Sequence, residues 1–189
     1  MECDMNKIEI NGLTFVLYLS EEEIQPAIQR VADKIKEDLA GKNPLFICIL
    51  NGAYMFASDL SKALNDAQAE ISFAKYSSYS GLESTGTLQE VMKPQVSVEG
   101  RTVVIVEDLI DTGFTVTEVE KLYKDRGAKE VYIAALLSKP GALKEGARDA
   151  DYVGLEIPND FIVGRGLDYD GGGRMLRDIY VLEDSENQD

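Results

Sequence analysis

The sequence predicts an α/β fold in which a mostly parallel, twisted sheet is covered by helices on both faces. Three apolar runs without polar alternation are typical of strands buried on both faces of such a sheet: 45–50, 103–106 and 131–137. Segments with apolar residues at helical spacing lie between these runs. Strands that alternate with helices along the chain favour a doubly wound sheet.

Composition limits the kind of protein. With 189 residues and 44% hydrophobic content, the chain can bury a core, and we expect one domain over 1–182 followed by an acidic, frayed tail over 183–189. No apolar run approaches the roughly 20 residues of a membrane helix, so no membrane partner is expected. The start lacks a basic stretch followed by an apolar one, which predicts no secretory signal.

Cysteine usage indicates the cellular location, and the net charge limits the kinds of partner that the protein can bind. Cys3 stands near the terminus and Cys48 inside an apolar run, so we expect no disulfide and a cytoplasmic location. The net charge of −15 argues against nucleic acid as a partner, because phosphate backbones are bound by clusters of Lys and Arg. The chain has no histidine, so acid–base chemistry falls to carboxylates, Lys or Tyr.

The remaining elements follow from turn and cap signals. An Asn-Gly pair marks a hairpin, a Ser-x-x-Glu capping box opens the first helix, and Gly41 and Gly127 each end a helix. A polar stretch over 78–88 has no periodicity and is expected to be irregular. In chain order we expect a hairpin over 8–15, a helix between Ser20 and Gly41, a strand over 45–50, a helix over 54–64, strands over 71–77 and 103–106, a helix from about 115 to 126, and strands over 131–137, 152–155 and 162–163.

The motif with the most chemistry follows the apolar run 103–106. Glu107 and Asp108 come at its carboxyl end, where ligands of parallel sheets bind, and neighbouring carboxylates can accept hydrogen bonds from the vicinal hydroxyls of a ribose. The turn 111–113 then leads into a helix, whose free N–H groups and the nearby threonine hydroxyls form an anion seat. The pattern matches neither the P-loop nor the dinucleotide fingerprint. The alternative is an ordinary strand-turn-helix junction with Asp and Thr as caps, which the two preceding acids make less favoured.

These residues resemble the phosphoribosyl pyrophosphate (PRPP) motif of type I phosphoribosyltransferases. From about Ile8 to Leu182 the chain is similar to the bacterial hypoxanthine(-guanine) phosphoribosyltransferases, with the separate motifs in the family order. The resemblance implies an enzyme of purine salvage. It would transfer the 5-phosphoribosyl group of PRPP to hypoxanthine, and to guanine, with Mg²⁺ as cofactor and IMP or GMP and pyrophosphate as products. The resemblance also implies a small hood, formed by the N-terminal hairpin and the C-terminal segment, and a homodimer or homotetramer.

The resemblance further assigns residues to each part of the site. Glu107 and Asp108 hold the ribose, and Asp111 is the base that accepts the purine proton. A non-proline cis peptide is expected at Leu50-Asn51, although Asn51 stands where several relatives carry Lys or Arg. The other assignments are the 5′-phosphate turn (Asp111, Thr112, Gly113, Phe114, Thr115), the pyrophosphate residues (Leu50, Asn51, Gly52, Arg174), the flexible lid (Ser78, Tyr79), and the purine pocket (Lys139, Phe161, Ile162, Asp168), in which Asp168 also binds Mg²⁺.

Other interpretations of these residues stay open. Lys139 can be a solvated lysine at a strand end, Phe161 a core residue, and 51–53 a plain connection. An ammonium at Lys139 suits the O6 of hypoxanthine or guanine rather than an amino group, but it does not choose between these two bases. The other functions considered are transfer to xanthine or uracil, and a non-catalytic sensor of PRPP or nucleotides. The acidic charge argues against a sensor, because such regulators typically bind RNA or DNA.

Overall fold

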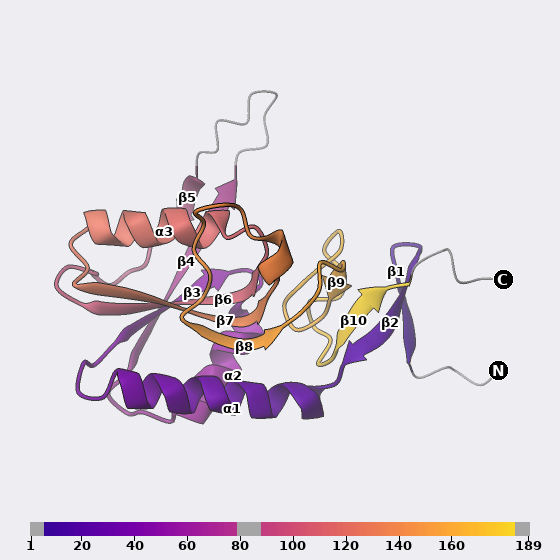
Figure 1. The fold of residues 1–189 in the computed structure, drawn as a ribbon, viewed down its shortest axis with the longest axis horizontal. Coiled ribbons are helices and arrows are strands. Elements are labelled where there is room, and N and C mark those ends of the chain that lie inside the picture. The colour runs from indigo at the N-terminus through magenta and orange to yellow at the C-terminus, as the bar shows by residue number, and fades with distance from the viewer. Residues whose placement is uncertain (1–5, 79–87, 184–189) are drawn as a thin grey trace.

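The computed structural model describes residues 6–78 and 88–183 of the chain (Figure 1). It contains a six-stranded sheet with helices on both faces and, beside it, a smaller four-stranded sheet. Cys3, Tyr79 of the expected lid and residues 184–189 of the expected tail lie outside the described residues. Within the described ranges, no helix is long and apolar enough to cross a membrane.

The larger sheet has the strand order β5-β4-β3-β6-β7-β8, and only the pair of β4 and β5 is antiparallel. Its strands are β3 (Leu45–Leu50), β4 (Glu70–Ser78), β5 (Leu88–Met92), β6 (Thr102–Ile110), β7 (Glu130–Ser138) and β8 (Tyr152–Glu156). The predicted α/β fold with a mostly parallel sheet is confirmed. Strand β3 has β4 on one side and β6 on the other, so the order of the sheet reverses between β3 and β6. Ligands of open α/β sheets bind at the carboxyl ends of strands at such a switch point.

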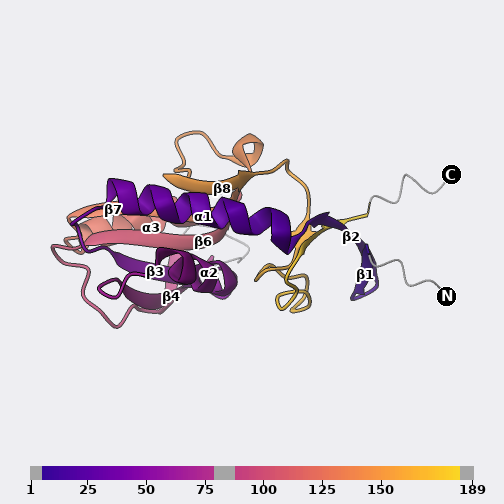
Figure 2. The same cartoon turned by 90° about the horizontal axis from the view of Figure 1, so that it is seen from below.

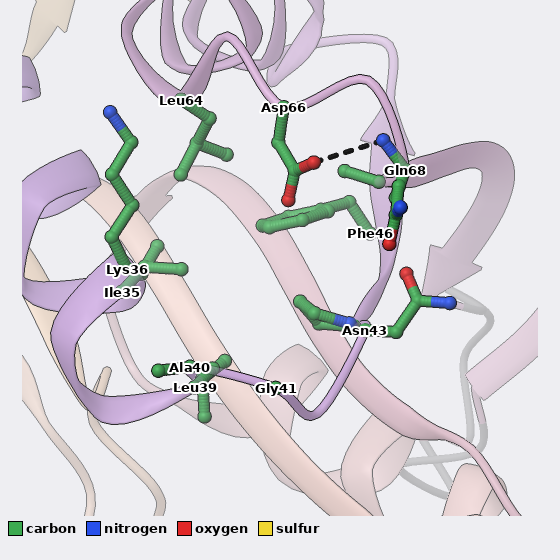
Figure 3. A pocket seen from close by; sticks show the side chains of 12 residues that line it. Ile35, Lys36, Leu39, Ala40, Gly41, Asn43, Phe46, Leu64, Asp66 and Gln68 are labelled. Carbon is green, nitrogen blue, oxygen red and sulfur yellow. Dashed lines mark hydrogen bonds between the residues drawn. The ribbon is translucent and has the colours of Figure 1, made fainter.

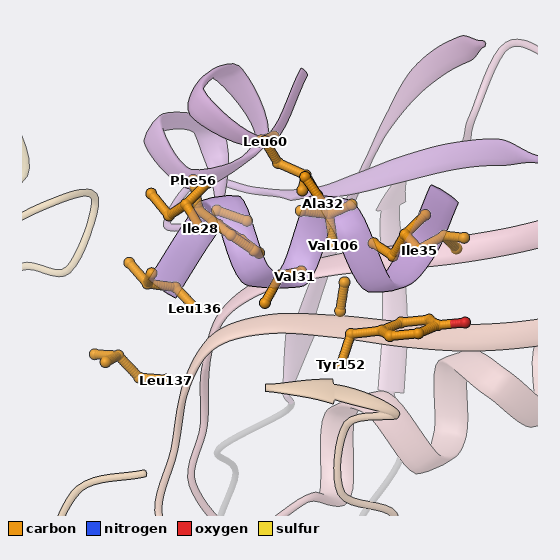
Figure 4. Packing of buried hydrophobic residues seen from close by; sticks show 14 of the residues in the cluster. Ile28, Val31, Ala32, Ile35, Phe56, Leu60, Val106, Leu136, Leu137 and Tyr152 are labelled. Carbon is orange, nitrogen blue, oxygen red and sulfur yellow. The ribbon is translucent and has the colours of Figure 1, made fainter. Parts of the chain in front are cut away.

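Three helices cover this sheet: α1 (Glu21–Asp38), α2 (Tyr54–Leu64) and α3 (Phe114–Asp125). Helices α1 and α2 lie on one face and α3 on the other (Figures 1 and 2). Side chains of β3 alternate between the faces, because Phe46 packs with α1 and α2 whereas Ile47 packs with α3. Figure 4 shows the first of these layers, in which Val31 of α1 packs with Val106 of β6. Both faces are therefore apolar, which explains the continuous apolar runs in the sequence.

The smaller sheet is the predicted hood. Its order is β1-β2-β10-β9 with antiparallel neighbours, and its strands are β1 (Lys7–Ile10), β2 (Leu13–Leu19), β10 (Ile179–Leu182) and β9 (Ile162–Val163). The hairpin turn holds Asn11 at φ 49° and Gly12 at φ 82°, as an Asn-Gly turn requires. Phe15, Val163 and Tyr180 form the centre of the hood, so the N-terminal and C-terminal segments share one core.

The structure differs from the sequence prediction at four strands. Strand β6 continues to Ile110, so Glu107 and Asp108 lie inside the strand rather than after it. Ser78 and Leu88, which were predicted to be irregular, belong to β4 and β5. Strands β5 and β10 were not predicted at all. Each is only four or five residues long and is stabilised by hydrogen bonds to another strand, the preceding β4 for β5 and the distant β2 for β10.

Cavities lie at both ends of the parallel strands of the larger sheet. The cavity in Figure 3 has a volume of about 210 Å³ and lies at the amino-terminal ends of the strands, where Ile35 of α1 and Leu39, the residue after that helix, approach Phe46 and Leu64. Its nearest lysine, Lys36, already donates to the carbonyl oxygen of Ala63 at 2.9 Å. The motif predicted from the sequence lies at the opposite, carboxyl-terminal ends of the strands.

Candidate functional site

The turn after β6 encloses a cavity of about 100 Å³ that is lined by Glu107 and residues 109–116. Gly113 has φ 74°, and a Cβ atom there would lie 2.6 Å from the carbonyl oxygen of Arg148, so only glycine fits. Helix α3 begins at the next residue without a side-chain cap, which leaves N–H groups of its first turn for a ligand. The five residues predicted to hold a 5′-phosphate line this one cavity: Asp111, Thr112, Gly113, Phe114 and Thr115.

Asp111 is the exposed member of this group. Its carboxylate has no hydrogen-bond or ion-pair partner among the described residues, so it is available to a bound ligand. A general base must come within roughly 2.6–3.2 Å of the atom whose proton it takes, and a free carboxylate at the edge of the cavity can meet that condition.

Glu107 lines this cavity, and Asp108, the next residue of β6, meets Gly52 of the loop after β3. Burial raises the pKa of Glu107 well above its usual range, and the neighbouring Asp108 carboxyl raises it further. Burial also raises the pKa of Asp108, although a hydrogen bond with Glu107 and the charge of Arg174 act in the opposite direction. Two buried acids in contact disfavour the doubly ionised state, so hydroxyl groups that donate to them would stabilise the charged pair. Beside them in β3, burial raises the pKa of the free thiol of Cys48 to about 12.

The loop after β3 lies against Asp108 and against the hood. The Leu50-Asn51 peptide bond is cis, as the resemblance predicted. A Cβ atom on Gly52 would lie 1.8 Å from Oδ2 of Asp108, so the loop backbone rests directly on that carboxyl group. A Cβ atom on Gly166, which has φ 103°, would lie 1.8 Å from the carbonyl oxygen of Gly52. Loop 50–52, β6 and the segment after β9 thus meet through two glycines.

Arg174 and Asp168 join this group from the hood side. Their side chains form an ion pair with an Nη2 to Oδ1 distance of 2.6 Å, and Asp168 also accepts from the Gly171 N–H at 2.8 Å. Arg174 donates through Nη1 to the carbonyl oxygen of Gly166 at 2.6 Å, which holds it beside loop 50–52. Among the described residues, no group of three or more His, Cys, Asp or Glu is arranged to hold a metal ion.

The residues predicted to bind a purine lie at the ends of strands in both sheets, Lys139 directly after β7 and Phe161 directly before β9 of the hood. Lys139 follows β7, and its N–H donates to the carbonyl oxygen of Ile110 at 2.9 Å, which fixes it beside the phosphate turn. The residue is buried, and its ammonium has no hydrogen-bond partner in the described part of the chain. Phe161 is 46% exposed, so it is not a core residue, and its ring meets Tyr169 edge-on with centroids 5.8 Å apart.

The side chain of Ile162 is buried, so only its backbone groups are available to a ligand. The N–H of Leu182 donates to the carbonyl oxygen of Phe161 at 2.9 Å. The pair of Ile162 and Val181 is therefore of the non-hydrogen-bonded type, and the N–H and C=O of Ile162 point away from β10. Because β9 is the last strand of the hood sheet, these groups face the open edge.

Three residues at the site were missed by sequence reasoning. Lys75, in β4, lies beside Asn51, and Tyr54 donates through its hydroxyl to the carbonyl oxygen of Arg174 at 3.1 Å. Arg165 is fully buried, forms an ion pair with Asp59 of α2, and has φ 47°. No local pattern marks them, because each is defined by a partner far away in the chain. The only sequence signal is a lysine near the end of a predicted strand.

A parallel α/β sheet with a glycine turn and an uncapped helix start at its switch point is typical of proteins that bind phosphorylated ligands. The family described as "Phosphoribosyl transferase domain" matches residues 18–170 of this chain. That match spans most of the sequence, and the chain belongs to the phosphoribosyl transferase family.

Similar proteins come from several bacteria. The chain is 41% identical over 176 residues to a hypoxanthine-guanine phosphoribosyltransferase of Streptococcus agalactiae, covering 92% of this chain and 96% of the relative. It is 39% identical over 170 residues to the enzyme of the same name from Streptococcus thermophilus, covering 89% and 93%. A crystal structure of a hypoxanthine phosphoribosyltransferase from Staphylococcus aureus matches with a TM-score of 0.83 and 35% identity, covering 92% of this chain and 94% of the other.

Proposed function

We propose that the protein is a purine-salvage enzyme that transfers the 5-phosphoribosyl group of PRPP to hypoxanthine or guanine, forming IMP or GMP and pyrophosphate. The observation that carries the proposal is the switch point, where Glu107 and the turn after β6 line one cavity and the next residue, Asp108, meets loop 50–52. The relatives, which are named for hypoxanthine and guanine, support the choice of acceptor.

The order of groups in the crevice matches the order of groups in PRPP. The cavity at 109–116 takes the 5′-phosphate, Glu107 and Asp108 accept from the ribose hydroxyls, and loop 50–52 with Arg174 takes the pyrophosphate. Since the two acids lie between the turn and the loop, the ribose lies between its two phosphorylated ends. Closure of a lid that includes Ser78 and Tyr79 is part of the proposal, because water competes with the purine.

The purine side of the proposal uses three groups. Lys139 donates to O6 of the base, because its ammonium has no partner in the described protein and a carbonyl oxygen would supply one. The exposed ring of Phe161 stacks on the purine, and the free peptide groups of Ile162 meet its edge. Adenine carries an amino group at position 6. This group and the ammonium of Lys139 would both act as hydrogen-bond donors, so adenine is disfavoured.

In the reaction, a purine ring nitrogen forms a bond to C1′ while the bond from C1′ to the pyrophosphate oxygen breaks. The electron pair of that bond leaves with pyrophosphate, and C1′ becomes cation-like. Carboxylates nearby stabilise the positive charge. The proton on the attacking nitrogen passes to Asp111, whose carboxylate has no partner in the described residues.

Mg²⁺ fits this site as an ion that arrives with the phosphorylated ligand. Magnesium is usually held by one or two carboxylates together with substrate phosphates, and Asp168 supplies one such carboxylate beside Arg174. When bound, the ion would neutralise charge on the pyrophosphate. Asp168 would turn one oxygen from Arg174 to the ion and keep its hydrogen bond from Gly171.

The direct test is a steady-state assay with PRPP and a panel of bases. We expect turnover with hypoxanthine and guanine and none with uracil. Activity only with xanthine or uracil would identify another phosphoribosyltransferase, and PRPP binding without turnover of any base would indicate a sensor. The proposal includes a single domain over 1–182, a cytoplasmic location and a homodimer or homotetramer, for which light scattering gives the oligomeric mass.

A further inference from the structure

We propose that Lys75 is a pyrophosphate-binding residue, which supplies the positive charge that the loop after β3 itself lacks. At 51–53 this loop carries Asn, Gly and Ala, and none of these can neutralise an anion. Lys75 comes from the neighbouring strand β4, where it pairs with Leu50, the last residue of β3. The proposal rests on the proposed function, because it assigns a ligand group to the same crevice.

The geometry places the ammonium of Lys75 at the loop. Its Nζ lies 3.4 Å from Oδ1 of Asn51, and this amide oxygen is its only polar partner among the described residues. Leu50 packs in the cluster beneath α1 and α2, so its lateral neighbour Lys75 projects to that same face of the sheet. Asp108 reaches loop 50–52 from the other side of β3, so the loop lies between an acid that faces the ribose and an uncompensated cation.

The charges around the loop show why this lysine matters. The chain has 34 acidic and 19 basic residues, so its net negative charge repels an incoming polyanion, and a cation beside the loop offsets that repulsion locally. Arg174, the other cation beside the loop, is already ion-paired with Asp168 at 2.6 Å. An incoming pyrophosphate therefore meets one cation whose charge is compensated and one whose charge is not. A flexible stem and three donors let Lys75 exchange the weak amide contact for phosphate oxygens.

Titration calorimetry with magnesium pyrophosphate, PRPP and IMP tests the assignment in the full-length protein. Lys75→Gln should weaken the binding of pyrophosphate and PRPP by about tenfold to a hundredfold, the range for losing one hydrogen bond between charged groups. Binding of IMP, which has no pyrophosphate, should change by less than about twofold on the same scale. Lys75→Arg keeps the charge and should retain most of the affinity.

Two further variants separate a ligand contact from a structural role. Lys93→Gln removes the same charge from an exposed residue that follows β5, and it should bind pyrophosphate as the wild type does. Adding Asn51→Lys to Lys75→Gln returns a cation to the loop and should restore pyrophosphate affinity. If Lys75→Gln binds pyrophosphate as tightly as the wild type, or weakens IMP equally, the assignment is wrong. Absence of nucleotide formation by the wild type would instead overturn the proposed function, which the assay with bases reports separately.

Discussion

The contact between Gly166 and Gly52 gives the sharpest test of how the hood positions the site. A Cβ atom on Gly166 would lie 1.8 Å from the carbonyl oxygen of Gly52, whereas real Cβ contacts are essentially never below 3.0 Å. The two segments must therefore separate by at least 1.2 Å in Gly166→Ala. Because the obstacle is backbone rather than a flexible side chain, the loop that we assign to pyrophosphate moves with it.

We expect both a kinetic and a stability effect from this substitution. A displacement of about 1 Å at a substrate-positioning element can cost about a hundredfold in rate, so kcat/KM for PRPP should fall by roughly that factor. Overpacking and a non-glycine residue at positive φ each cost about 1–3 kcal/mol, so the free energy of unfolding should fall by roughly 2–6 kcal/mol. Steady-state kinetics and urea unfolding measure the two effects.

A matched control separates the contact from backbone strain. Gly12 in the hood hairpin has φ 82°, and a Cβ atom there would meet nothing within 4 Å. Gly12→Ala should therefore lose only the strain energy, about 1–3 kcal/mol, and keep its kcat/KM. The packing argument is refuted if Gly166→Ala matches Gly12→Ala in both stability and kinetics.

Three other predictions concern single side chains. Lys139→Met should lower kcat/KM for hypoxanthine by about tenfold to a hundredfold, because a charged donor to O6 is lost, while leaving PRPP affinity unchanged; an unchanged kcat/KM would remove Lys139 from the base pocket. Asp111→Asn should cut kcat by about 10²–10⁴-fold with near-normal PRPP affinity, and wild-type turnover would exclude Asp111 as the base. The raised pKa of Glu107 stabilises the free protein below the unfolded-state pKa of about 4.3, and this contribution is lost as the pH rises through the folded-state pKa. Urea unfolding between about pH 4.5 and pH 8 should therefore show Glu107→Gln gaining stability relative to the wild type as the pH rises, and parallel pH profiles would contradict the buried acid pair.

Much of the fold could be predicted from the sequence because its signals are local. Apolar runs such as 45–50 become strands buried on both faces, and Ser20 with Glu23 forms the predicted capping box. The left-handed conformations at Asn11 and Gly12 follow directly from the residue types. These elements were found because the physical reason for each lies within a few residues of chain.

The site was predictable to the extent that it lies on one continuous segment. The turn 111–115 was placed correctly because its glycine, hydroxyls and helix start are consecutive, and they line one cavity in the structure. The residues that complete the crevice come from elsewhere. Lys75 comes from β4, and Arg174 reaches Gly166 through a side-chain hydrogen bond that no spacing in the sequence announces.

The sequence alone determined the class of sheet, the position of the turn before α3, and the two acids that precede it, because hydrophobic periodicity, glycine conformation and helix starts depend on neighbouring residues. Tertiary structure decided which distant segments lie together around the site. Strand β10 joins β2 across more than 150 residues, Arg165 is buried against Asp59, and Gly166 rests on Gly52. Such contacts form because only the packed sheet and hood bring these distant segments together without overlap of their backbones, and that condition belongs to the whole molecule.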